Sequence, residues 1–203
     1  MRKMFRLCAV LLLLCALAAA PTIYRGYQLY HSAVTETPIA EKTAEIRNDP
    51  DFVPLSEMDE YFVEEIIRSE DKRFYCHPGI DPLAIARALK NDILAGSFVE
   101  GGSTITQQLA KNMYFDFEKV MERKAAEVFA AFRLEWKYTK EEILELYLNC
   151  IYFGENCYGI KEAAAYYYGA EPDALTESQA DSLVYTIKCP NLYNPVVLSK
   201  NTV

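Results

Sequence analysis

The chain contains little glycine, little proline and a shortage of basic residues. Among 203 residues there are 8 glycines and 9 prolines, which excludes collagen-like and low-complexity proteins. Only 21 Lys and Arg stand against 29 Asp and Glu, and the net charge is −8. Because neutralising phosphates requires a basic surface, the composition predicts no nucleic-acid partner. An anionic ligand would have to be held by a local cluster of cations.

Charged side chains are also missing from residues 7–24, a run of 18 residues that reads LCAVLLLLCALAAAPTIY. As a helix this run spans about 27 Å, close to the roughly 30 Å of a bilayer's hydrocarbon core. Arg2, Lys3 and Arg6 precede it, so the positive-inside rule places the N-terminus in the cytoplasm and the remainder outside. The sequence therefore predicts a single-pass anchor in the bacterial cell membrane over residues 1–30.

The alternative for this segment is a cleaved signal peptide, because Ala18 to Ala20 resemble a small-residue cleavage site. Ile23 and the tyrosines that follow extend the apolar character and favour a retained anchor. Both readings export the rest of the chain. Residues 31–54 show no strong pattern and are predicted as a stalk, which leaves residues 55–203 as the globular domain.

Four cysteines lie in the exported part of the chain, at Cys76, Cys150, Cys157 and Cys189. An oxidising compartment favours disulfides, so we expect one bridge, with three possible ways of pairing the four thiols left open. Their spacing matches no zinc pattern.

The pattern of apolar residues predicts an all-α domain of about eight helices, since no alternating strand pattern lasts six residues. Capping signals begin helices at Ser56, Thr139 and Thr176. In the longest helix we expect an apolar inner face made of Val120, Val128, Phe129, Phe132 and Trp136. The predicted helices include residues 56–70, 82–95, 105–113, 117–138, 140–149 and 177–188.

The first chemically informative segment is EDKRFYCHPG, residues 70–79. A carboxylate at Glu70, backed by apolar residues of the preceding helix, would be partly desolvated, and its raised pKa would suit proton transfer near neutral pH. The alternative is that Glu70 and Asp71 balance Lys72 and Arg73 on the surface. His77, near a helix end, is more typical of a hydrogen-bonding cap than of a catalyst.

The second segment is GGSTITQQLAKN, residues 101–112, a glycine loop that enters a helix. It nearly matches a P-loop, but Gly102 stands where the lysine should be and no strand precedes it, which argues against a nucleotide site. Thr104, Gln108 and Lys111 share one helix face. Such a face can bind sugars and phosphate oxygens, and a plain solvent-exposed face is the alternative.

In the third segment, Lys119, Arg123 and Glu127 form one stripe of one helix. The stripe predicts a cationic ledge for a diphosphate, with Glu127 held ionised by Arg123. A simple surface pair, worth a few tenths of a kcal/mol, is the alternative. The residues just before it, Met113 to Phe117, are largely apolar and belong either to the core or to a surface that dips into the bilayer.

Taken together and in this order, these segments resemble the transglycosylases of bacterial cell-wall synthesis, glycosyltransferase family 51. GGSTITQQLAKN is very specific, and a fourth match covers residues 140–154. The resemblance extends over roughly residues 50–195. It implies a lysozyme-like, two-lobed all-α fold with a small lobe that touches the membrane, as in monofunctional biosynthetic glycosyltransferases and the transglycosylase domain of class A penicillin-binding proteins.

The reaction that the resemblance implies is polymerisation of lipid II into β-1,4-linked glycan strands, with inversion and release of polyprenyl diphosphate. Glu70 would be the general base, and Glu127 would act in the donor site, near the diphosphate or its metal ion. The cations implied to stabilise the leaving diphosphate are Lys111, Lys119 and Arg123. The positioning residues implied are Ser103, Gln107, Gln108, Asn112, Lys124 and Arg87.

A divalent cation, Mg²⁺ or Mn²⁺, is usual for such leaving groups, but the sequence contains no dedicated cage for one. Glu127 is the metal-ligand candidate. The implied partners are lipid II, polyprenyl-diphosphate-linked glycan, the membrane and other cell-wall synthesis proteins.

Several positions depart from the family pattern. Cys76 fills a variable position in the first motif, Ala126 replaces a lysine found in some members, and residues 183–190 match poorly. No KTG or SxN element follows the matched region, so the sequence predicts a monofunctional enzyme without a transpeptidase domain.

Two other functions are considered. A lysozyme-like hydrolase would use Glu70 as general acid, but a neutral polysaccharide requires neither the cationic stripe nor an anchor. A catalytically silent scaffold would not require Glu70 and Glu127.

Overall fold

The computed structural model describes residues 2–97, 101–115 and 121–200. These residues form an all-helical protein, as the sequence predicts, and the one strand-like feature among them is an isolated bridge between Tyr152 and Tyr158. The described ranges contain eleven α-helices and two 3₁₀ helices (η), more than the eight predicted. The helices are α1 (Arg2–Glu36), α2 (Ile39–Arg47), η1 (Leu55–Glu57), α3 (Glu60–Glu70), η2 (Phe74–Cys76), α4 (Pro82–Ala95), α5 (Ile105–Tyr114), α6 (Met121–Lys137), α7 (Lys140–Cys150), α8 (Gly159–Tyr168), α9 (Glu177–Lys188), α10 (Pro190–Tyr193) and α11 (Pro195–Lys200).

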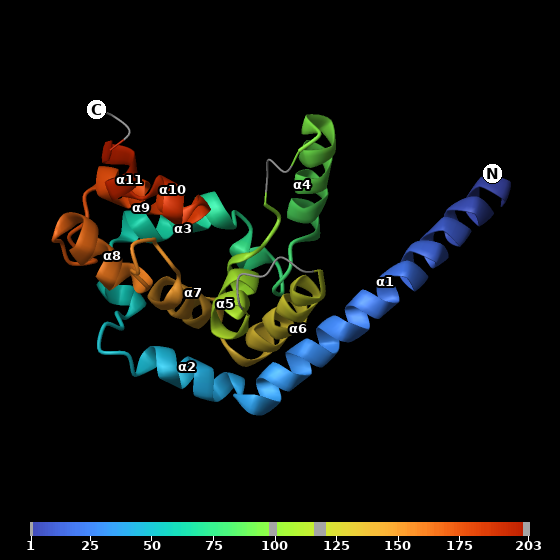
Figure 1. Cartoon of the computed structure of the whole chain (residues 1–203), viewed down its shortest axis with the longest axis horizontal. Coiled ribbons are helices and arrows are strands. Elements are labelled where there is room, and N and C mark those ends of the chain that lie inside the picture. The colour runs from blue at the N-terminus through green and yellow to red at the C-terminus, as the bar shows by residue number, and fades with distance from the viewer. Residues whose placement is uncertain (1, 98–100, 116–120, 201–203) are drawn as a thin grey trace.

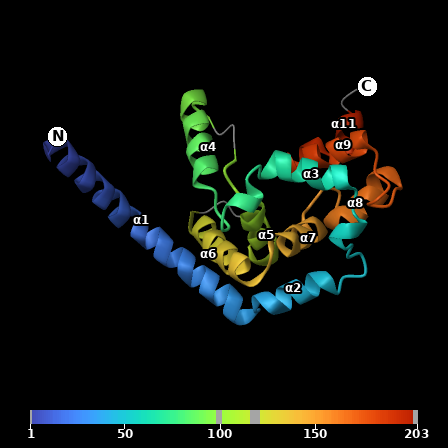
Figure 2. The same ribbon diagram turned by 180° about the vertical axis from the view of Figure 1, so that it is seen from behind.

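Helix α1 projects from the body of the protein as one long rod that ends at the N-terminus, and α2 follows it at a sharp bend (Figures 1 and 2). Most of the segment predicted as a stalk is therefore helical: its first residues complete α1 and the next part forms α2. Among the residues that the structure describes, none of the helices is both long enough and apolar enough to cross a bilayer.

The core of the body lies around α7, whose residues Ile143, Leu144, Leu146, Tyr147 and Leu148 are buried. Helices α5 and α8 pack against it, and α3 packs against α9. This arrangement brings the end of α3, the start of α5 and the end of α9 to the same side of the body, which is where the candidate site lies.

Side-chain hydrogen bonds cap the starts of five of the described helices, α3, α4, α5, α7 and α9. The predicted start of a helix at Ser56 is wrong: residues 55–57 form η1, and α3 begins after Asp59, whose carboxylate accepts a hydrogen bond from the Phe62 N–H at 2.8 Å. The Pro82 start and Gly96 end of α4 are as predicted. The capping boxes at Thr139 and Thr176 are also present.

The predicted inner face of α6 is only partly right. Phe132 and Trp136 are 42% and 75% exposed, and Val120 lies outside the described residues. The buried positions are instead small: Ala126, Ala130 and Ala131, with Leu134. Small side chains let neighbouring helices approach α6 closely, so large apolar residues were not needed there. Two of the large residues keep other contacts: Phe129 packs on tyrosines of α1, and the Arg133 guanidinium lies 4.3 Å from the centre of the Trp136 ring.

The four cysteines of the body are free thiols, so the predicted disulfide is absent among the described residues. Each lies in a different element or loop, and two have other partners: the thiol of Cys150 hydrogen-bonds the Tyr147 carbonyl, and that of Cys157 the Glu155 carbonyl. The apolar segment after Lys111 belongs to the core where it is described. Met113 is buried, and Tyr114 and Phe115 pack on the core, with the Tyr114 hydroxyl donating to the Thr37 carbonyl at 3.0 Å.

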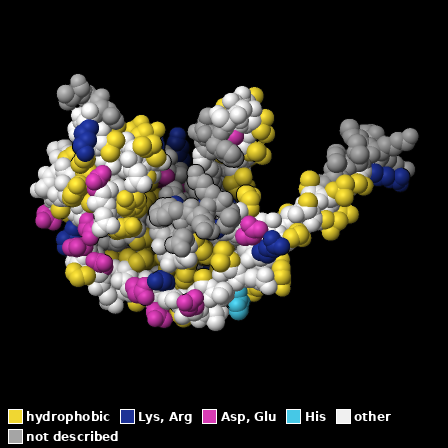
Figure 3. All heavy atoms as spheres, in the orientation of Figure 1, with side chains coloured by type: hydrophobic (Ala, Val, Ile, Leu, Met, Phe, Trp, Pro, Cys, Tyr) yellow, Lys and Arg dark blue, Asp and Glu magenta, His cyan; other side chains and the backbone are white. Residues whose placement is uncertain are grey.

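Helix α4 stands apart from the rest of the body (Figures 1 and 2). It carries a row of exposed large apolar side chains, visible along one side of the helix in Figure 3. These residues are Leu83, Ile85, Leu89, Ile93 and Leu94.

Gly154 gives a first test of the packing. Its φ is +87°, and a Cβ there would overlap the carbonyl oxygen of Pro190 and lie 3.1 Å from the amide nitrogen of the fully buried Asn194. Gly96 has a similar φ of +65° with open space around it. We expect Gly96→Ala to cost about 1–2 kcal/mol of unfolding free energy for its backbone alone, and Gly154→Ala to cost at least about 2 kcal/mol more because atoms must also move. Urea unfolding of both variants measures the difference, and equal losses would contradict the close packing of α10 on this loop.

Candidate active site

A cavity of about 610 Å³ opens between α3, α4, α5, α6 and α9. Five of the described residues that line it are cationic and two are carboxylates, in a chain whose net charge is −8. The lining residues are Ser69, Glu70, Arg87, Gly101, Ser103, Gln108, Lys111, Arg123, Lys124, Glu127, Ile187 and Lys188. The local cluster of cations that the acidic composition requires for an anionic ligand is therefore present.

Glu70 is the last residue of α3, and its carboxylate lies at the cavity wall. Burial raises the pKa of Glu70 above its ordinary value, while the hydrogen bond from Gln108 and the charge of Lys188 lower it in part. The Gln108 amide donates to Glu70 Oε2 at 2.8 Å, and the Gln108 carbonyl accepts from the Tyr147 hydroxyl at 3.0 Å. Tyr147 is fully buried, and burial keeps its pKa well above the ordinary value, so it stays a donor. These two hydrogen bonds in series fix Oε2 of the Glu70 carboxylate.

Glu127 lies on the opposite wall, on α6, and is only 2% exposed. Its two oxygens pair with cations of the same helix: Arg123 Nε lies 3.0 Å from Oε1 and Lys124 Nζ lies 2.7 Å from Oε2. Lys124 also donates to Ser103 Oγ at 2.7 Å, which joins α6 to the glycine loop before α5. A buried carboxylate with two cations at a cavity wall is not a simple surface pair, because its charges are shielded from solvent.

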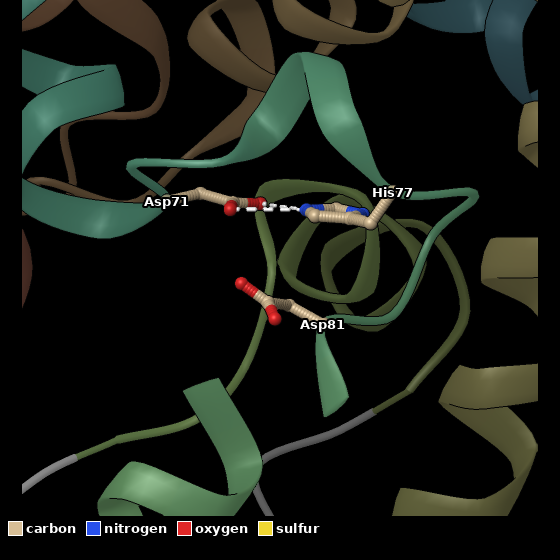
Figure 4. Close-up of side chains that lie close together, drawn as sticks. All are labelled: Asp71, His77 and Asp81. Atoms are coloured by element: carbon tan, nitrogen blue, oxygen red, sulfur yellow. Dashed lines mark hydrogen bonds and ion pairs between the residues drawn. The ribbon is translucent and has the colours of Figure 1, made fainter. Parts of the chain in front are cut away.

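Glu127 is not by itself a dedicated metal cage, because a divalent ion prefers several oxygen ligands. Its Oε2 accepts a hydrogen bond from Lys124, whereas its buried Oε1, 3.0 Å from Arg123 Nε, makes no hydrogen bond to any of the described residues. A second group of possible ligands consists of three buried residues, Asp71, His77 and Asp81 (Figure 4). Their candidate ligand atoms all lie within 4.8 Å of one another.

The atoms of that second group have structural partners. His77 Nδ1 accepts the Gly79 N–H at 3.2 Å, so Nε2 carries the proton that it donates to Asp71 at 3.0 Å. Asp71 Oδ2 also accepts the Ile105 N–H at 3.1 Å. His77 therefore has the hydrogen-bonding role predicted for it.

Asp81 is the cap of α4. Its Oδ1 accepts the N–H groups of Leu83 and Ala84, and its Oδ2 lies 2.7 Å from Arg73. Although burial acts to raise it, the hydrogen bond from Arg73 keeps the pKa of Asp81 below its ordinary value. The group is thus a clamp on the turn between α3 and α4, in which Asp81 is paired with Arg73, and Asp71 is hydrogen-bonded to His77 and to the Ile105 N–H.

Further contacts hold the same turn against the body. The Thr104 hydroxyl donates to the Gly79 carbonyl at 2.6 Å, and Lys140 Nζ donates to the His77 carbonyl at 2.7 Å. Lys140 is paired with Glu135 at 2.6 Å. Because Glu70 directly precedes this turn, the clamp determines where its carboxylate points.

Most of the predicted site residues meet in the cavity, and two of the described ones, Gln107 and Asn112, do not. Gln107 is buried, and its side chain completes the capping box of Thr104 at the start of α5. Asn112 is exposed outside the lining, and its amide hydrogen-bonds the thiol of Cys150. Lys119 lies outside the described residues. The predicted residues that line the cavity are Glu70, Arg87, Ser103, Gln108, Lys111, Arg123, Lys124 and Glu127.

The lining residues that sequence reasoning missed are Ser69, Gly101, Ile187 and Lys188. Lys188 is the informative one, because it lies in the segment with the poorest match to the family pattern. Lys188 is the last residue of α9, and it reaches the cavity because α9 packs on α3. That packing is a tertiary contact, which the local sequence does not indicate.

Comparison with known proteins identifies the class. Residues 36–203 match the family model described as Transglycosylase. The chain is 47% identical over 145 residues to penicillin-binding protein 1F of Bacillus subtilis (strain 168), which covers 71% of this chain and 20% of that protein. It is 42% identical to penicillin-binding protein 1B of Haemophilus influenzae (70% of this chain, 19% of that protein) and 42% identical to penicillin-binding protein 1A of Aquifex aeolicus (71% and 20%).

The chain therefore belongs to the transglycosylase family, which confirms both the family and the class of enzyme predicted from the motifs. It spans about a fifth of the length of the curated relatives that it matches.

The raised pKa of Glu70 predicts how stability depends on pH. A carboxyl whose pKa is higher folded than unfolded destabilises the protein once it must ionise, by about 1.4 kcal/mol per pKa unit. We expect Glu70→Gln to raise the melting temperature at pH 7, and the gain to vanish below the unfolded pKa of about 4.3, where both states are protonated. Calorimetry across this range, with the exposed Glu64→Gln on the same helix as control, measures the effect. A gain that is the same at all pH values would show that Glu70 ionises normally.

Proposed function

We propose that the protein is a peptidoglycan glycosyltransferase that polymerises lipid II into β-1,4-linked glycan strands and releases polyprenyl diphosphate. The observation that supports this most directly is the cavity in which Glu70, Glu127 and five cations face one another. A sugar linked to a diphosphate lipid requires both a proton acceptor for the attacking hydroxyl and cations for the leaving group.

In this reaction Glu70 is the general base. The 4-hydroxyl oxygen of the incoming lipid II forms a bond to the anomeric carbon of the growing chain, and the hydroxyl proton moves to Glu70. The bond from that carbon to the diphosphate oxygen breaks on the opposite face, so the configuration inverts. General-base assistance is typically worth about 10²–10⁴-fold in rate. The hydrogen bond from Gln108 to Oε2 orients the carboxylate for this step.

The cations stabilise the diphosphate as negative charge grows on it. Arg123 and Lys124 are held at the wall by Glu127, and Lys111 lines the same cavity from α5. Fixed charges of this kind need no reorganisation when the bond breaks, which makes them effective. Arg87 and Ser103 position the substrate, and Lys119 stays a predicted member of this set.

A divalent cation, Mg²⁺ or Mn²⁺, also stays a prediction. Glu127, whose buried Oε1 makes no hydrogen bond within the described part of the chain, is the residue that would hold such an ion, and the ion would supply extra positive charge for the leaving diphosphate.

We also propose that the enzyme works at the bacterial cell membrane, with the N-terminus inside and the catalytic body outside. The uncharged run in α1, preceded by basic residues, supports this placement, as do the exposed apolar side chains of α4. The substrates, lipid II and polyprenyl-diphosphate-linked glycan, are lipids of that membrane. Other cell-wall synthesis proteins stay predicted partners.

Labelled lipid II and the purified protein test the reaction. We expect long glycan strands from the wild type, a loss of at least about 10²-fold for Glu70→Gln because the base is removed, and near wild-type rates for Glu64→Gln on the same helix. Gel separation of the strands measures all three. Muropeptides released from finished wall would identify a hydrolase instead, and a Glu70→Gln variant as fast as the wild type would refute the assignment of the base.

Lys188 tests the electrostatics of the base. Its positive charge lowers the pKa of Glu70, so Lys188→Met should raise that pKa further and shift the rising limb of kcat/KM to higher pH. Lys161→Met, a surface lysine paired with Asp51 at 3.1 Å, should leave the limb unchanged. The pH profile separates this effect from a loss of binding, which would lower kcat/KM at every pH without moving the limb.

A further inference from the structure

Gly26 is the one buried residue in the middle part of α1, with exposed residues on either side of it. A Cβ at this position would overlap the Cβ of Ala125 on α6, and would lie 2.7 Å from the Glu122 carbonyl oxygen and 3.1 Å from the Ala126 nitrogen. The backbones of the two helices therefore touch at this point, and only a residue without a side chain fits between them.

Other contacts fix the same crossing on both sides of Gly26. Arg25 lies 3.6 Å from Glu122, and the Tyr27 ring packs edge-on against Phe129 with 5.4 Å between ring centres. The Tyr30 ring lies 5.9 Å from the same phenylalanine. Both views of the ribbon show α1 running alongside α6 (Figures 1 and 2).

Helix α6 has this contact on one side and the cavity on the other. Glu122, Ala125 and Phe129 meet α1, while Arg123, Lys124 and Glu127 line the cavity. The helix is also packed against α5, and its inner side is buried at Ala126, Ala130, Ala131 and Leu134. A displacement of α6 at the α1 contact would therefore move the cations.

We propose that Gly26 is a positioning residue for the cationic wall of the cavity. By letting α1 lie directly on the backbone of α6, it sets the distance of Arg123, Lys124 and Glu127 from the opposite wall, which carries Glu70. This inference rests on the proposed function, in which Arg123, Lys124 and Glu127 act on the leaving diphosphate. Gly26 itself touches no substrate and acts through α6.

The experiment places side chains of increasing size at this position in the full chain. Misplacing a catalytic group by about 1 Å can cost roughly 10²-fold in rate, so we expect Gly26→Ile to lower kcat/KM for lipid II by about 10- to 100-fold, with a fall in kcat. Gly26→Ala should lie between this variant and the wild type. Gln28→Ile, which puts the same side chain on an exposed position of α1, should stay within about twofold of the wild type.

A compensating change distinguishes this crossing from a general effect on folding. Ala125→Gly removes the nearest atom that a methyl group at position 26 would overlap, whereas the Glu122 carbonyl oxygen at 2.7 Å stays in place. The double variant Gly26→Ala/Ala125→Gly should therefore recover part of the activity that Gly26→Ala loses. If Gly26→Ile does not fold, the comparison of Gly26→Ala with the double variant still tests the proposal. A double variant no better than the product of the two single variants would overturn the proposal.

Two further readouts separate positioning from stability and from the proposed function. Hydrogen exchange of residues 121–137 should quicken in Gly26→Ile, and calorimetric binding of farnesyl diphosphate, a short isoprenyl diphosphate, should weaken at least fivefold. Faster exchange with unchanged kcat/KM and unchanged diphosphate affinity would refute positioning. If the wild type makes no glycan, the proposed function fails, and diphosphate binding still tests Gly26: equal affinity of Gly26→Ile and Gln28→Ile would overturn it.

Discussion

The rest of the site depends on the hydrogen bonds that the buried carboxylate of Asp71 accepts. It joins the end of α3 to His77 in the following turn and to the first N–H of α5. Both partners of Asp71 are uncharged hydrogen-bond donors, and losing a hydrogen bond to a charged group typically costs about 1.5–3 kcal/mol. Since Glu70 and Ser103 lie on either side of this junction along the chain, the same contact places Glu70 and the glycine loop at one cavity. Asp71 thus has a structural role, and its neighbour Glu70 lies at the cavity wall.

The two carboxylates of the cavity lie on different helices, Glu70 on α3 and Glu127 on α6. Burial at the end of α3 raises the pKa of Glu70, whereas Glu127 on α6 is held between Arg123 and Lys124. Two carboxylates in one cavity thus have different environments, which suits one for proton transfer and the other for holding cations. The overall charge of −8 then helps to confine anion binding to this place, because the rest of the surface repels anions.

Local chemistry made part of this structure predictable. The caps at Thr139 and Thr176, the proline start of α4 and the spacing of Arg123 and Glu127 depend on neighbours a few residues apart, and each is found as expected. The glutamates and most of the cations of the cavity were found through motifs. Their roles in catalysis rest on the proposed reaction.

What could not be predicted depends on contacts between distant parts of the chain. Lys188 reaches the cavity because α9 packs on α3, and nothing near it in the sequence indicates this. Gln107 fits a polar face by its spacing, yet its amide completes a cap, since the first turn of a helix has unpaired N–H groups. The apolar residues Phe132 and Trp136 suggested an inner face, whereas alanines occupy it because close helix packing requires small side chains.

The exposure of Trp136 has a practical consequence. It is the chain's single tryptophan, it lies on the helix that carries the cationic wall, and its ring is in contact with solvent and with the Arg133 guanidinium. Its fluorescence therefore comes from α6 alone. Ligand-induced movement of that helix would be visible as a change in emission of the unlabelled protein, and quenching by iodide or acrylamide would report how open its surroundings are.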